Sequence, residues 1–150
     1  MGAFNQATPL SAYQQVGKSD VAYADPHRLI SILMDGALDR IARARHAMLA
    51  ERIAQKGELI GNAITIISGL KGCLNMETGE ALSANLADLY DYMCRRLVLA
   101  NAQDDDALLD EVSGLLSEIR FAWDAIPESA KRTAGSVPSQ PGDDNSSAGE

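Results

Sequence analysis

The sequence predicts an all-α fold, an antiparallel four-helix bundle with a short additional N-terminal helix or arm. Four segments carry apolar residues at spacings of three or four, which is the periodicity of an amphipathic helix. Strand-like alternation is nearly absent, and the connections between the segments are short. Because amphipathic helices joined by short connections bury their apolar stripes against one another, we expect these segments to pack as a bundle.

The first long helix is expected to begin in the sequence ADPHRLI. Asp25 suits the N-cap position there, and Pro26 suits the first helical position because its fixed φ matches a helix. Apolar residues then form the stripe Ile30, Leu33, Met34, Ala37, Ile41, Ala44 and Met48. Three further apolar residues, Ile32, Leu38 and Leu49, lie beside or away from this stripe. The first helix is therefore apolar on more than one face.

The second helix, over about residues 52–75, combines an apolar stripe with a face of small residues. Its expected core residues are Leu59, Ile60, Ala63, Ile67, Leu70 and Leu74. Its opposite face carries Gly61, Thr65, Ser68, Gly69 and Gly72. Each interior glycine costs roughly 0.5–1 kcal/mol of stability relative to alanine. Two interpretations stay open: tolerated drift on a solvated face, or a shallow track that another chain approaches closely, flanked by Ile64 and Ile66.

The third helix is expected over about residues 80–101, after a turn at Gly79. Its inner face is predicted to consist of Leu82, Leu86, Leu89, Tyr90, Met93 and Leu97. Residues two apart on a helix, such as Tyr90 and Tyr92, differ in direction by about 200°, so both cannot face the core. Tyr92 and Leu99 lie beside each other outside this face, and we expect both to be accessible to a partner.

The fourth helix is expected over about residues 105–126, with Asp104 as its cap. Its stripe consists of Leu108, Leu109, Val112, Leu115, Leu116, Ile119, Ala122, Trp123 and Ile126. Phe121 lies about 160° around this helix from Trp123 and should be exposed on the bare bundle.

Composition divides the chain into three regions. Residues 1–24 are predicted to form an N-terminal arm with a short helix, since apolar residues such as Tyr13 stand there among polar ones. Residues 25–126 form the bundle. Residues 127–150 are an acidic tail rich in Ser, Gly and Pro, with Val137 as its only sizeable aliphatic residue. Such a segment cannot bury enough apolar area to offset the entropy of ordering, so we expect it to be disordered.

Charge and composition favour a cytoplasmic protein without a nucleic-acid partner or a membrane span. The net charge of −8 disfavours phosphate binding, which needs a basic patch. No apolar run is long enough to span a membrane, and the first residues lack the basic start and apolar run of a signal peptide. The two cysteines are too few for a disulfide framework and are expected to be reduced residues packed in helices.

The sequence predicts no catalytic residue, no cofactor and no metal site. His27 and His46 are the only histidines, and both are interpreted as surface residues. No phosphate loop, zinc spacing, nucleophile elbow or Glu-x-x-His pair occurs. Arg95 and Arg96 beside Cys94 favour a lowered thiol pKa, but the position of Cys94 in an apolar pattern favours packing over reactivity.

Several segments resemble the FliS family of flagellar secretion chaperones. They are YQQV near the start, ADPHRLISILMDGAL, KGELIGNAITIISGLKGCLNME, NLADLYDYMCRRLVLAN and LLDEVSGLLSEIRFAWDAI. The resemblance covers roughly Leu10 to Ile126 in order. Its most specific part is the run LYDYM.RRL..AN, followed by a tryptophan near the end of the next helix. The stretch after Ile126 departs from the family pattern.

The resemblance implies a cytoplasmic, non-enzymatic type III export chaperone. Members bind the disordered C-terminal segment of flagellin, prevent its premature polymerisation and deliver it to the flagellar export gate. The family's own N-terminal segment can occupy part of the client surface. Matched to this sequence, the N-terminal tyrosine motif falls on Tyr13 and Val16, and the late tryptophan falls on Trp123. Other flagellar clients and a homodimer stay open as further partners.

Residues outside the core stripes are the candidate client contacts. They are Ile32, Leu38, Leu49, Gly61, Ile64, Ile66, Tyr92, Leu99 and Phe121. Recognition of a helix in a groove uses such surplus apolar surface. Tyr13 and Val16 are assigned to the arm that covers the site or contacts the export gate. The alternative function is a structural homo-oligomer, whose surplus apolar faces meet a second copy and which has no client peptide.

Overall fold

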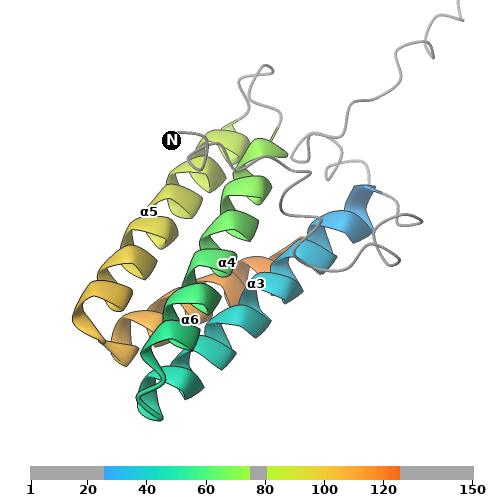
Figure 1. Ribbon diagram of the computed structural model, residues 1–150. Coiled ribbons are helices and arrows are strands. Elements are labelled where there is room, and N and C mark those ends of the chain that lie inside the picture. The colour runs from blue at the N-terminus through green and yellow to red at the C-terminus, as the bar shows by residue number, and fades with distance from the viewer. Residues whose placement is uncertain (1–25, 75–80, 126–150) are drawn as a thin grey trace, which may run out of the picture.

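Four helices make up the part of the chain that the computed structural model describes, residues 26–74 and 81–125. They are α3 (Pro26–Leu49), α4 (Ile53–Gly72), α5 (Ala81–Gln103) and α6 (Asp106–Ala125) (Figure 1). These residues contain no strand, so the all-α prediction is confirmed, and a four-helix bundle is consistent with the arrangement. The predicted N-terminal arm with Tyr13 and Val16, the turn at Gly79 and the C-terminal tail lie outside the described residues and stay predictions.

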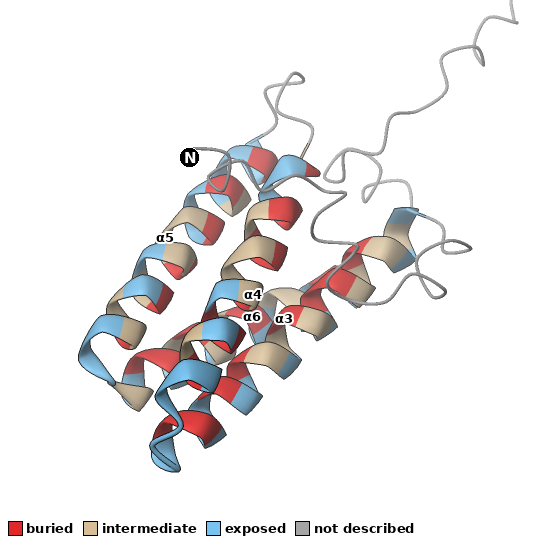
Figure 2. Ribbon diagram, viewed as in Figure 1, coloured by how far each residue is buried: buried red, intermediate tan, exposed pale blue. Residues whose placement is uncertain are grey.

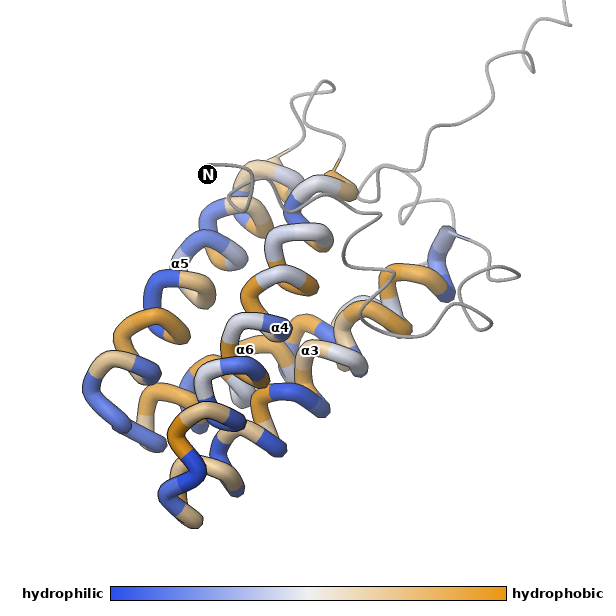
Figure 3. Tube along the Cα trace, in the orientation of Figure 1, coloured by the Kyte–Doolittle hydropathy of each residue, from blue (hydrophilic) through white to orange (hydrophobic). Residues whose placement is uncertain are grey.

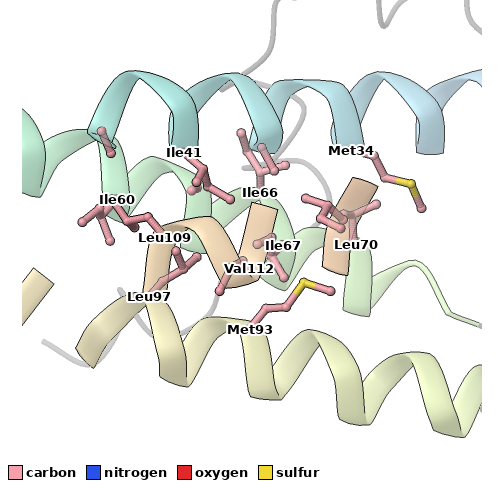
Figure 4. Packing of buried hydrophobic residues seen from close by; sticks show 14 of the residues in the cluster. Met34, Ile41, Ile60, Ile66, Ile67, Leu70, Met93, Leu97, Leu109 and Val112 are labelled. Atoms are coloured by element: carbon pink, nitrogen blue, oxygen red, sulfur yellow. The ribbon is translucent and has the colours of Figure 1, made fainter. Parts of the chain in front are cut away.

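The helices pack in a closed order, α3 against α4, α4 against α5, α5 against α6 and α6 against α3. Figure 2 shows buried residues on the sides of the helices that face one another, and Figure 3 shows that many of these positions are hydrophobic. All four helices contribute side chains to one core (Figure 4). Each fully buried Leu or Ile stabilises the fold by roughly 1.5–3 kcal/mol of transfer free energy.

The core confirms most of the predicted stripes. The stripe of α3 is buried throughout, and that of α4 is buried except for the half-buried Leu74. The prediction is wrong for Leu82 and Leu89 on α5, which are 42% and 36% exposed. This helix is turned so that its inward residues are Ser83, Ala87, Tyr90, Met93, Leu97 and Ala100. On α6 the prediction is wrong for Ala122, which lies at the outer edge of the stripe and is exposed.

The turn between α5 and α6 uses two neighbouring aspartates for different purposes. The Oδ1 atom of Asp105 accepts a hydrogen bond from the backbone N–H of Ala107 at 3.0 Å, which makes Asp105 the N-cap of α6. Asp104 has φ 51°, in the left-handed region that commonly ends a helix. The predicted cap at Asp104 is therefore wrong by one residue, because Asp104 is the residue that reverses the chain after α5.

Lys56 ties the first turn of α4 to the end of α5. Its side chain is only 5% exposed. The Nζ atom donates a hydrogen bond to the backbone carbonyl oxygen of Asn101 at 3.0 Å and pairs with the Asp104 carboxylate. A buried charge is tolerated only when it is paired, so this contact sets how the N-terminal end of α4 packs on α5.

Candidate binding surface

Six large apolar side chains remain exposed in the described part of the chain. They are Leu49, Ile53, Leu82, Leu89, Val98 and Phe121. The predicted exposure of Leu49 and Phe121 agrees with exposed fractions of 66% and 79%. The sequence pattern does not predict the exposure of Ile53 and Val98, which are 70% and 58% exposed. One feature of the sequence indicates that Val98 is exposed: it lies one turn after Cys94, away from the inner face of the helix.

The seam between α4 and α5 contains two residues of the candidate set, Gly61 and Ile64. We define the α4–α5 seam as Gly61, Ile64, Ser68 and Lys71 of α4 together with Asp91, Cys94 and Val98 of α5. Lys71 Nζ lies 2.9 and 3.0 Å from the two carboxylate oxygens of Asp91. Ser68 Oγ lies 3.8 Å from Cys94 Sγ, and that thiol lies 4.0 Å from the carbonyl oxygen of Ile64. Polar contacts therefore close one end of the seam.

The other end of the seam is open at Gly61. A Cβ atom built at Gly61 would meet nothing within 4 Å, and the residue is exposed. Gly61 lies three residues before Ile64, so it stands one turn farther along the same side of α4. Val98 lies four residues after Cys94 and is 58% exposed. The seam thus offers an exposed valine on α5 and, on α4, a half-buried isoleucine one turn from a position without a side chain.

The structure contradicts part of the predicted track on α4. Ile66 is fully buried, so its assignment to the client surface is wrong. Gly69 is also buried and does not share an exposed face with Gly61. The reason is geometric: residues on the two flanks of a helix face different neighbours, and the polar contacts of α4 with Asp91 and Cys94 of α5 come from the flank that carries Ile64.

The remaining predicted contacts do not form one face. Leu38 and Leu99 are half-buried and pack against the core, and Ile32 is half-buried on α3. Leu49 lines a cleft between α3 and α6, whereas Phe121 projects from the C-terminal half of α6. These side chains come from three helices.

Tyr92 is held against α6. Its hydroxyl group donates a hydrogen bond to Glu111 Oε2 at 2.5 Å, and Arg96 Nε donates to Glu111 Oε1 at 2.9 Å. The Arg96 guanidinium lies 5.5 Å from the centre of the Tyr92 ring. The hydrogen bond raises the pKa of Tyr92, and the bonds from Tyr92 and Arg96 lower the pKa of Glu111. A partner that contacts Tyr92 meets a side chain already fixed in direction.

The histidines and cysteines do not form a reactive group in the described residues. His27, predicted to be a surface residue, is half-buried and stacks on Trp123 with ring centres 5.3 Å apart. His46 is exposed, as predicted. Burial raises the pKa of the Cys94 thiol, and Cys73 is a buried free thiol. No three His, Cys, Asp or Glu residues among residues 26–74 and 81–125 are placed to hold a metal ion.

These features define a class of protein, a helical bundle that presents exposed apolar side chains. None of the helices in the described ranges has the length and apolar character needed to cross a membrane. The chain belongs to the FliS family: the family model described as flagellar protein FliS matches residues 9–130. That family consists of flagellar secretion chaperones rather than enzymes.

Named relatives support the same family. The chain is 52% identical over 118 residues to the flagellar secretion chaperone FliSB of Pseudomonas aeruginosa, covering 78% of this chain and 94% of that protein. It is 44% identical over 126 residues to flagellar secretion chaperone FliS of Salmonella typhimurium, covering 83% and 93%. It is 40% identical over 119 residues to FliS of Vibrio cholerae, covering 79% and 88%.

Proposed function

We propose that this protein is a cytoplasmic type III export chaperone for flagellin. In this proposal it binds the disordered C-terminal segment of flagellin, prevents premature polymerisation and delivers the subunit to the flagellar export gate. Membership of a family of flagellar secretion chaperones supports the class of function. The observation that carries the client site is the open end of the α4–α5 seam, where the bare position Gly61 and half-buried Ile64 lie on α4 and exposed Val98 lies on α5.

The mechanism is thermodynamic. An amphipathic client segment that would associate with other copies through its apolar face buries that face on the chaperone instead. Because the segment folds on binding, ordering consumes roughly 2–5 kcal/mol or more of the interaction energy, which keeps the complex reversible. Gly61 lets a client backbone approach α4 closely, since no side chain stands between them. Tyr13 and Val16 belong in this proposal to an arm that covers the site or contacts the gate.

The test fills the bare position. Gly61→Leu should weaken binding of a flagellin C-terminal peptide by about tenfold or more, which corresponds to about 1.4 kcal/mol, as measured by titration calorimetry. Gly114→Leu on α6 is the matched control, because Gly114 is also an exposed helix-interior glycine with nothing within 4 Å of a built Cβ atom. This control should leave the affinity unchanged.

A second substitution separates binding from folding. Gly61→Ala should stabilise the free protein by roughly 0.5–1 kcal/mol, because alanine is the better helix former and meets no neighbour. Equal peptide affinity for Gly61→Leu and Gly114→Leu would remove the seam as the client site. A tight dimer that the peptide does not displace would favour the homo-oligomer instead.

A further inference from the structure

A cleft of about 380 Å³ lies between the C-terminal half of α3 and the N-terminal half of α6, outside the α4–α5 seam. Its lining residues are Ile41, Ala42, Arg45, His46, Leu49, Leu109, Asp110 and Ser113. Ile41 and Leu109 are buried beneath it at 1% and 0% exposure, so its accessible apolar surface comes from Leu49, which is 66% exposed, and from exposed Ala42. The cleft therefore combines apolar contact surface with polar groups at its edge, which is the usual composition of a peptide-binding site.

The cleft lies beside the most basic stretch of an acidic chain. Residues 40–56 contain Arg40, Arg43, Arg45, Arg52 and Lys56, with Glu51 as the only acidic residue among them. Arg40 and Arg43 pair with Asp39, and Lys56 is buried against Asp104. Arg45 lies 3.3 Å from a carboxylate oxygen of Asp106 and 3.3 Å from one of Asp110. Arg52 takes part in no ion pair in the described ranges 26–74 and 81–125, and His46 is exposed at the cleft. An apolar occupant followed by carboxylates would place its carboxylates near Arg52 and His46 at this end of α3.

The C-terminal tail of this chain carries that combination. The sequence VPSQPGDD, residues 137–144, places the tail's sizeable aliphatic residue Val137 and two prolines before Asp143 and Asp144. Residues 133–150 contain no basic side chain. The family model ends at residue 130, so this segment belongs to the part of the chain outside the family match.

The tail is also long enough to reach the cleft. The distance along α6 from Ala125 back to Asp110 is about 22 Å, from the rise of 1.5 Å per residue. The twelve residues from Ala125 to Val137 span up to about 40 Å when extended. Their expected end-to-end distance as a flexible chain is about 20 Å, close to the required span.

We propose that the cleft between α3 and α6 is the intramolecular docking site of residues 137–144. Val137 packs against Leu49 and Ala42, above the buried side chains of Ile41 and Leu109, and the two aspartates lie near His46 and Arg52 at the C-terminal end of α3. The prolines favour an extended polyproline II conformation, which reduces the entropy lost on docking. Because a short tether gives an effective concentration in the millimolar range, even a millimolar contact keeps the cleft occupied for a substantial part of the time.

The full chain allows a direct test by amide NMR spectroscopy. Val137→Ser and the double change Asp143→Asn/Asp144→Asn should each shift the Arg45, His46 and Ser113 amide signals in the same direction, toward the undocked position. Raising the ionic strength from about 0.01 M to about 1 M should move the wild-type signals the same way, because the Debye length falls from about 30 Å to about 3 Å. Ser147→Ala, in the tail beyond the docking segment, is the control and should move none of them.

Three outcomes would overturn the proposal. The cleft signals could stay in place in both variants, or shift equally in Ser147→Ala, or shift with protein concentration in the wild type. The last outcome would identify a second copy of the chain as the occupant. None of these results bears on flagellin binding at the seam, so the test of tail docking is independent of the test of client binding.

Discussion

Replacing Lys56 with methionine would remove one buried ammonium group while keeping an apolar side chain of similar length. The Nζ atom of Lys56 is a hydrogen-bond donor to the carbonyl oxygen of Asn101. That carbonyl lies in the last turn of α5, where helix carbonyls lack main-chain partners. Lys56→Met therefore leaves a polar group without its donor at the contact between α4 and α5.

The magnitude follows from the burial of each partner. An unsatisfied buried acceptor costs about 1–3 kcal/mol; because Asn101 is half-buried, Lys56→Met should lower the free energy of unfolding by an amount near the lower end of that range, about 1 kcal/mol. Lys56→Ala also removes three methylene groups from a side chain that is 5% exposed, which adds about 2 kcal/mol at about 0.8 kcal/mol each. Asp104→Asn should cost about 1 kcal/mol or less, because the Asp104 side chain is 59% exposed and water replaces the lost pair.

Urea unfolding provides the assay, with helix content measured by circular dichroism and the core measured by fluorescence of Trp123, the single tryptophan. Agreement of the two transitions is needed for the free energies to be compared. The reasoning fails if Lys56→Met stays within about 0.5 kcal/mol of the wild type, the range of ordinary surface changes. If Lys56→Ala is no less stable than Lys56→Met, the methylene groups of Lys56 are not packed and the predicted extra loss for Lys56→Ala is wrong.

Three further predictions concern a carboxylate, a thiol and a core residue. Since the pKa of Glu111 is lowered in the folded state, its stabilisation is present above the pKa of an unfolded carboxyl group and is lost as the pH falls through the folded value. The difference in unfolding free energy between wild type and Glu111→Gln should thus become smaller as the pH falls from about 6 to about 3. If the difference between wild type and Glu118→Gln falls equally, the hydrogen bonds to Glu111 are not the cause. Because burial raises the pKa of Cys94, a disulfide reagent at about pH 8 should label the native protein at least about tenfold more slowly than the urea-unfolded protein, and equal rates would contradict this. Ile66→Ala should cost about 2–5 kcal/mol of unfolding free energy, whereas Ile53→Ala, at a 70% exposed position, should stay within about 0.5 kcal/mol; similar losses would mean that Ile66 is not a core residue.

The periodicity of the sequence predicts helices better than it predicts their rotation. The repeat from Ile30 to Met48 identifies both α3 and its buried face, because one stripe there is much more apolar than the others. On α5 the apolar residues spread around more of the helix, and two stripes are possible. Leu89 and Tyr90 were both assigned to the core, but only Tyr90 is buried. Packing against α4 and α6 selects the stripe, and that choice is not visible in α5 alone.

The candidate site was predictable to a similar extent. Exposure of Leu49 and Phe121 followed from their positions off the stripes. Tyr92 was expected to point outward and wait for a partner, but Glu111, nineteen residues later, accepts its hydrogen bond. A pattern within one helix cannot identify a partner on the next one. For the same reason the pattern of α4 predicts a surface position for Ile66, which is fully buried.

The sequence by itself determined the all-α class, the four helical segments and the resemblance to the FliS family. These depend on the 3.6-residue repeat, on turn residues and on ordered motifs, which are properties of short stretches of chain. Only the tertiary structure decided that Lys56 is buried and bound to Asn101 and Asp104, and that Gly61 is open on the α5 side of α4. Those features depend on how each helix is rotated against its neighbours, and that rotation minimises the free energy of the whole core rather than of one segment.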